Sequence, residues 1–80
     1  MMKLVNFTHL HDYWFVLDFE NGEQKRVDLT GLIASHVSQE EIKTAHIDSE
    51  WGCLEFNNAM VDIEPKTLYG YAKQNEAEAA

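Results

Sequence analysis

The segment that most constrains the fold of this 80-residue chain is an alternating run followed directly by a turn signal. Large apolar or aromatic residues occupy every second position of the run: Tyr13, Phe15, Leu17 and Phe19. This period of two is the spacing of one face of a β-strand, and strands favour these residue types. Asn21-Gly22 follows, and this pair tolerates the positive φ angles that a tight hairpin needs. We therefore expect a β-hairpin whose second strand runs from Glu23 to Leu29.

Further strands are expected on both sides of this hairpin. The residues alternate from Lys3 to Leu10, which would place Val5, Phe7 and His9 on one face. Three shorter segments rich in apolar residues complete the set: 46–48, Trp51–Phe56 and Ala59–Ile63. Asn57-Asn58 is expected to form the turn between the last two.

Helical signals are short. Leu32-Ile33 suits a helical turn, and Ser38 with Glu41 has the spacing of a capping box, in which each side chain bonds the other residue's backbone N–H. Pro65 suits the first turn of a final helix, where its missing N–H costs nothing. The buried face of that helix is expected to consist of Leu68, Tyr71 and Ala72, which have helical spacing. Gly70 lowers the helix propensity and would indicate close packing or an early helix end.

Together these elements predict an α+β fold. We expect one small antiparallel sheet of four to six strands, including the Asn21-Gly22 hairpin, with two or three short helices. Residues 1–74 would form a single compact domain, and the acidic, low-complexity residues 75–80 a flexible tail.

Charge and cysteine content narrow the function. The chain has 14 acidic and 6 basic residues, a formal charge of −8, which opposes direct binding to nucleic-acid phosphates. The single cysteine, Cys53, cannot form an internal disulfide, so we expect a reducing cytoplasmic location. No apolar run reaches the roughly 18 residues of a membrane span, and the first residues lack the pattern of a signal peptide.

The sequence offers no convincing catalytic or metal-binding pattern. Cys53 has no histidine close to it in sequence, and the adjacent pair Ser35-His36 lacks the geometry of a working dyad. His9 and His11 are two positions apart, so they would lie on one face of the expected strand and could bind zinc with a third ligand. This spacing is common in strands and is not specific to metal sites. We therefore expect no enzyme activity, no cofactor and no metal, and keep a ligand or metal site at His9 and His11 as an alternative.

The acidic residues have two interpretations. They can form a solvated surface that keeps the protein soluble, or an acidic surface that binds a basic protein. Exposed tryptophans beside such acids would serve as interface anchors. The candidate partner-binding residues are Trp14, Asp18, Glu20, Glu23, Glu50, Trp51 and Glu55.

Several motifs, taken together, resemble a known family. The hairpin sequence is followed by Arg26-Val27-Asp28-Leu29, then by Gly52-Cys53-Leu54-Glu55-Phe56-Asn57 and finally by Asp62-Ile63-Glu64-Pro65-Lys66-Thr67-Leu68-Tyr69. This order is similar to that of the small bacterial proteins called domain-of-unknown-function family 2442, over about residues 3 to 72. Two departures are Phe56, where tryptophan is usual, and Asn58-Ala59, where glycine is common.

The resemblance implies a compact α+β fold and no established activity. Members of this family are often found beside small toxin-like partner proteins, so the resemblance also implies an antitoxin-like or adaptor role. In the closing motif Asp62 would accept backbone N–H bonds at the start of the last helix, and Leu68 and Tyr69 would dock it.

We therefore expect a non-enzymatic, acidic interaction module of the antitoxin, inhibitor or adaptor kind, with a basic protein partner. The alternatives are an acidic inhibitor from a mobile element that mimics nucleic acid, and the ligand or metal site named above. Pairing of two copies through an exposed strand edge would give a homodimer.

Overall fold

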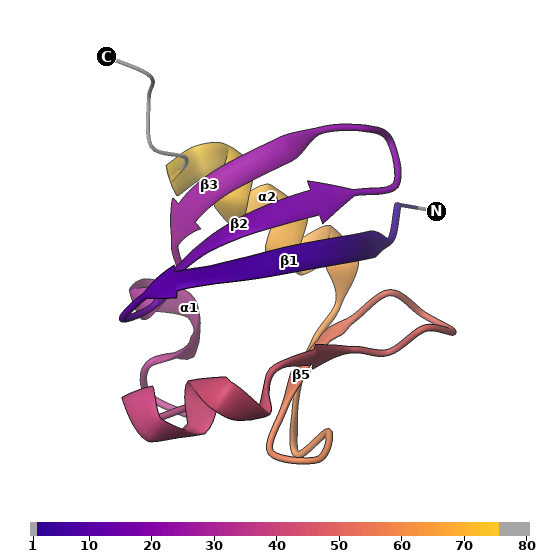
Figure 1. The fold of residues 1–80 in the computed structure, drawn as a ribbon. Helices are drawn as coiled ribbons and strands as arrows, with labels where there is room; N and C mark the ends of the chain where they lie inside the picture. Colours follow the sequence, from indigo (N-terminus) through magenta and orange to yellow (C-terminus); the bar gives the residue numbers. More distant parts are fainter. Residues whose placement is uncertain (1, 76–80) are drawn as a thin grey trace.

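The computed structural model describes residues 2–75 and shows an α+β fold (Figure 1). The first antiparallel sheet has the order β1 (Leu4–His11), β2 (Trp14–Phe19) and β3 (Gln24–Asp28). The second antiparallel sheet has the order β4 (His46–Ile47), β5 (Leu54–Phe56) and β6 (Val61–Ile63). The helices are α1 (Thr30–Ile33), the 3-10 helix η1 (Gln39–Thr44) and α2 (Pro65–Asn75).

The expected single sheet of four to six strands is thus wrong in its arrangement, because the six strands form two sheets of three. The chain leaves β3 through α1 and η1, and this excursion starts a separate ladder instead of adding a strand to the first one. The first sheet is tied to the loop that precedes β5, because the N–H of Leu4 donates to the carbonyl of Gly52 at 3.1 Å. Apart from Asn75, the expected acidic tail lies outside the described residues.

The central hairpin is confirmed. Phe15 pairs with Val27, and Leu17 with Lys25, so β2 lies between β1 and β3. All four alternating residues of the run from Tyr13 to Phe19 are buried, as the period of two requires. Gly22 has φ +90° at the turn, a backbone conformation that residues other than glycine rarely adopt.

Strand β1 does not keep the expected alternation. Leu4 pairs with Phe19 but Asn6 pairs with Asp18, so one extra residue lies between the two pairs as a β-bulge. The bulge shifts the phase of the strand. Leu4 and Phe7 both pack in the core although the alternation placed them on opposite faces, and Val5, expected on the face of Phe7, is 56% exposed.

The core lies between the first sheet, the second sheet and α2. In Figure 1, α2 runs along the side of the first sheet that faces away from the viewer. Leu68 and Ala72 of this helix are fully buried, as their spacing predicted. The rings of Phe15 and Phe56 meet edge to face, with centroids 6.3 Å apart, and join the two sheets. Tyr13 adds a polar anchor, because its hydroxyl donates to the carbonyl of Val37 at 2.6 Å.

The predicted capping box at η1 is also confirmed. The N–H of Ser38 donates to the Glu41 carboxylate at 2.8 Å, and the N–H of Glu41 donates to the Ser38 hydroxyl at 3.3 Å. These bonds satisfy donors that the first turn of a helix leaves without partners. Ile42 is then held in the core as the inward anchor of η1.

Gly70 marks neither close packing nor a helix end. The helix continues to Asn75, and a Cβ added at Gly70 would meet no atom within 4 Å. Because glycine weakens a helix interior by about 1 kcal/mol relative to alanine, we expect Gly70→Ala to raise the free energy of unfolding by about 0.5–1 kcal/mol. Urea denaturation followed by circular dichroism measures this. A loss of stability would show that α2 is not helical at Gly70.

Candidate functional site

The outward face of the second sheet carries a row of ionisable side chains. His46 of β4 lies opposite Glu55 of β5, and Glu55 lies opposite Asp62 of β6. The neighbouring row points inward and is apolar: Ile47, Leu54 and Ile63. Since successive residues of a strand face opposite sides, the buried row places the charged row on the other side of the sheet, where His46 and Asp62 are exposed and Glu55 is half-buried between them.

The loop before β5 presents Trp51 beside this row. The expected strand from Trp51 begins only at Leu54, because the Asp48 carboxylate accepts the N–H groups of Glu50 at 3.3 Å and Trp51 at 3.2 Å. These bonds and a φ of +73° at Gly52 fold residues 48–52 into a turn. The turn leaves the Trp51 side chain 56% exposed.

We call the resulting surface the acidic face: Asp48, Glu50, Glu55, Asp62 and Glu64, with Trp51 among them. A depression of about 550 Å³ lies within it, lined by Trp51, Cys53, Asp62, Glu64 and Pro65. Sequence reasoning placed Asp62 in the expected strand Ala59–Ile63, which β6 confirms, and Glu64 before the last helix, but it assigned neither residue to a binding surface. Their alternation around the buried Ile63 was the signal that could have assigned both to a strand face.

The pKa of the Cys53 thiol is affected by three of these carboxylates. Burial, a hydrogen bond from the thiol to Asp62 and the negative charges of Asp62, Asp48 and Glu55 raise its pKa to about 11. All these effects disfavour the thiolate. At neutral pH Cys53 is therefore a protonated thiol and a poor nucleophile.

His46 is held by acceptors at both ring nitrogens. Nδ1 lies 3.2 Å from the carbonyl oxygen of Thr44, and Nε2 lies 2.7 Å from Glu55 Oε1. Only the imidazolium can donate to both. The bond to Thr44 and the charges of Glu55 and Asp48 accordingly raise the pKa of His46. In its protonated form, His46 offsets the repulsion between Glu55 and Asp62, which lie directly opposite each other.

This geometry predicts a pH dependence. Because the folded-state pKa of His46 is raised above 6.5, its stabilising contribution is complete below pH 6.5 and is lost as the pH rises through the raised pKa. An NMR titration should show this raised pKa, and Glu55→Gln should lower it. The matched neutralisation Glu50→Gln should leave it nearly unchanged. Equal effects of the two variants would contradict the ion pair.

The other candidate acids lie on the first sheet, away from the acidic face. The Glu23 carboxylate accepts hydrogen bonds from Tyr69 at 2.6 Å and Asn21 at 2.5 Å, and Lys25 Nζ is 3.1 Å away. These partners lower the pKa of Glu23 to about 2, and the hydrogen bond from Tyr69 makes the largest contribution. Glu23 therefore ties the hairpin to α2 and is already engaged within the chain. Asp18 accepts from Gln24 at 2.8 Å, and Glu20 is exposed at the hairpin.

Trp14 lies on the outward face of the first sheet. It is half-buried, and the Arg26 guanidinium lies over its ring, 5.3 Å from the centroid. Of the seven candidate residues, the structure thus places Glu50 and Trp51 in the turn before β5 and Glu55 on β5. It places Trp14 and Asp18 on the first sheet and Glu20 and Glu23 in its hairpin turn.

Removing the Tyr69 hydroxyl should change the acid titration of Glu23. The contribution of Glu23 to stability is present above its ordinary pKa of 4.5 and is lost as the pH falls towards about 2. In Tyr69→Phe we expect the pKa of Glu23 to rise towards 4.5, so that this loss occurs at a higher pH. NMR titration of the Glu23 carboxyl carbon measures the shift. A pKa that stays near 2 would show that Lys25 and Asn21 suffice.

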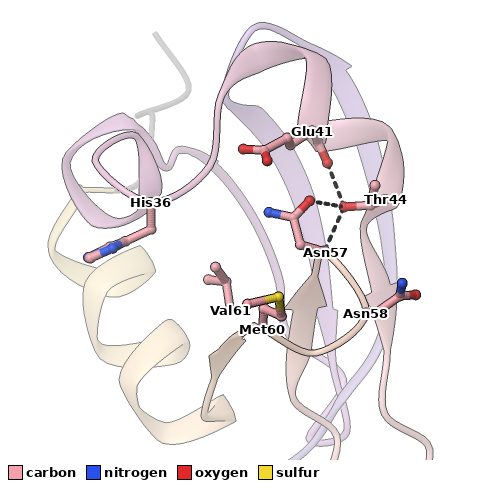
Figure 2. Close-up of a pocket in the computed structure, with 7 residues that line it drawn as sticks. All are labelled: His36, Glu41, Thr44, Asn57, Asn58, Met60 and Val61. Carbon is pink, nitrogen blue, oxygen red and sulfur yellow. Dashed lines mark hydrogen bonds between the residues drawn. The ribbon is translucent and has the colours of Figure 1, made fainter.

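A second depression, of about 570 Å³, lies between η1 and the β5–β6 turn (Figure 2). Three of its lining residues, Glu41, Thr44 and Asn57, are joined by hydrogen bonds. The Thr44 hydroxyl donates to the Glu41 carbonyl at 2.6 Å and accepts the N–H of Asn57 at 2.8 Å. These bonds fix the turn in which Asn57, Asn58 and Ala59 all have positive φ. We therefore interpret this depression as a structural joint between η1 and the second sheet.

The alternative of a histidine ligand site gains no support. His9 Nε2 lies 2.8 Å from the carbonyl oxygen of Asp12, and His11 Nδ1 lies 3.1 Å from the Asp12 carboxylate. Within residues 2–75, no three His, Cys, Asp or Glu side chains are grouped in a way that could hold a metal ion. Over the same residues, no helix has the length and apolar character needed to cross a membrane.

Comparisons with known proteins give one match. The model of the family described as "Protein of unknown function (DUF2442)" matches residues 4–74. This confirms the resemblance that the hairpin and the closing motif indicated. The search of curated proteins found no match, and neither did the search of solved structures.

Proposed function

Since the chain belongs to the DUF2442 family, whose function is unknown, we propose from the geometry that it is a non-enzymatic interaction module that binds a basic protein. The acidic face is the proposed binding surface. In this role the protein is an antitoxin-like inhibitor or an adaptor, which acts by covering a basic surface of its partner.

One observation carries the proposal: the exposed Trp51, held in a turn before β5, lines a depression together with the carboxylates of Asp62 and Glu64. Trp51 is 56% exposed, although burying its large ring would be favourable, and the Asp48 hydrogen bonds hold its loop in place. Tryptophan is the residue type most enriched among interface anchors, and surrounding charges of one sign speed the encounter with an opposite charge.

The chemistry of the same surface supports a binding role over catalysis. Its cysteine is a protonated thiol, and its histidine already holds Glu55 and Thr44. A nucleophile would need a lowered pKa and a free neighbouring base. The carboxylates Glu50, Asp62 and Glu64 remain at the exposed surface, where they can meet lysine or arginine side chains.

A tagged pull-down from nuclease-treated lysate of the host, analysed by mass spectrometry, tests the proposal. The wild type should capture one basic protein in stoichiometric amount, and less of it at higher salt, because salt screens exposed charges. The triple variant Glu50→Gln, Asp62→Asn, Glu64→Gln should lose this protein.

The matched control removes three negative charges elsewhere: Asp12→Asn, Glu20→Gln and Glu40→Gln. This control should retain the partner, since it leaves the acidic face intact. If both triple variants lose the partner equally, only net charge matters and the acidic face is not the binding surface. A wild type that captures nothing at low salt would refute the proposal itself.

A further inference from the structure

The acidic face continues into an apolar depression on the other side of Pro65. This second hollow, of about 310 Å³, is lined by Met2, Glu64, Pro65, Lys66 and Tyr69. Glu64 and Pro65 also line the depression beneath Trp51, so the two hollows share a wall. A ligand that extends from the acidic hollow across this wall would contact the apolar surface of the second hollow.

The walls of the apolar depression are fixed by the core. The Tyr69 ring meets Phe19 edge to face, with centroids 5.1 Å apart, and its hydroxyl is held by Glu23. Pro65 is buried at the start of α2. A side chain that enters the depression would therefore contact a preformed aromatic and aliphatic surface, which lowers the ordering cost of binding.

Charge distinguishes the two depressions. Asp62 and Glu64 line the first, which favours a lysine or arginine side chain of the ligand. Lys66 lines the second, and Lys25 Nζ lies 5.9 Å from the centre of the Tyr69 ring. Because Lys66 balances the shared Glu64 and the other lining residues are Met2, Pro65 and Tyr69, this depression has no excess negative charge and favours an uncharged apolar side chain.

We propose that the partner is bound through an extended segment in which a lysine or arginine is separated by only a few residues from a leucine, isoleucine, methionine or phenylalanine. The basic residue enters the acidic depression beneath Trp51, and the apolar residue enters the depression beside Tyr69. The inference rests on the proposed function and adds the chemistry of the recognised segment. The short spacing follows from the shared wall, because an extended chain advances about 3.3 Å per residue.

Selection from a displayed library of random dodecapeptides, with the full chain as bait, tests this pairing. The expected result is a motif with a basic residue and a large apolar residue a few positions apart. The variant Met2→Glu places a carboxylate beside the apolar depression and should abolish the apolar preference while the basic preference remains. The control Met60→Glu changes a methionine that is 86% exposed and does not line either depression, so it should leave the motif intact.

The outcomes separate the two proposals. Enrichment of basic residues alone would overturn the paired motif and leave the acidic interaction module standing. An apolar preference that survives Met2→Glu would also overturn it, because the apolar residue would then bind elsewhere. A selection without basic enrichment would contradict both proposals.

Discussion

Replacing Gly52 by alanine is expected to lower the free energy of unfolding by about 2–5 kcal/mol. Gly52 has φ +73°, where a Cβ costs about 1–2 kcal/mol of backbone strain. The added Cβ would also lie against the Lys3 side chain and 2.8 Å from Lys3 Cα, which is backbone and cannot move aside cheaply. The carbonyl of Gly52 also accepts the N–H of Leu4, so the contact between β1 and this loop should weaken.

Gly22→Ala is the matched control for this substitution. Gly22 also has positive φ, at +90°, but an added Cβ would meet no atom within 4 Å. It should therefore show only the strain part of the cost, about 1–2 kcal/mol. Chemical denaturation of both variants measures the difference. If Gly52→Ala costs no more than Gly22→Ala, the loop that carries Trp51 is not packed against Lys3.

Phe15→Ala is the second substitution with a large expected effect, a loss of roughly 3–5 kcal/mol. Phe15 is fully buried, and its ring contacts those of Phe7 at 5.9 Å and Phe56 at 6.3 Å between centroids. Truncation would leave a cavity where the two sheets meet. Because a domain of this kind has a total stability of only about 5–15 kcal/mol, the variant should melt at a markedly lower temperature.

Two comparisons make the Phe15 result specific. Val5→Ala, on the neighbouring strand at a side chain that is 56% exposed, should cost less than about 1 kcal/mol. A double-mutant cycle of Phe15→Leu with Phe56→Leu should give a coupling of about 0.5–1.5 kcal/mol, the value of an aromatic pair. Additive effects would show that the two sheets pack independently.

The parts of the fold that depend on neighbouring residues in the chain could be predicted from the sequence. The strand from Trp14 to Phe19 and its Asn21-Gly22 turn follow from side-chain alternation and backbone preference. The capping box of Ser38 and Glu41 follows from a fixed spacing. The face of α2 that is buried follows from a period of 3.6 residues.

The parts that depend on distant contacts could not be predicted. The bulge after Leu4 depends on its pairing with Phe19, and the packing of the two sheets against each other involves the contact of Phe56 with Phe15, which is distant in sequence. The acidic face is assembled from the 48–52 loop, β5 and β6, so its carboxylates are spread along the sequence. Glu23 was assigned to a partner surface because its bond to Tyr69 spans 46 positions of the chain.

A photo-crosslinking measurement in the living host tests the central claim most directly. Trp51 is replaced by the photoreactive residue p-benzoylphenylalanine in one variant, and Trp14 in another. The proposed function predicts that light attaches a basic protein to position 51 and not to position 14. The acidic face would be contradicted as the binding surface if position 51 gave no adduct, or if position 14 gave the same adduct in equal amount.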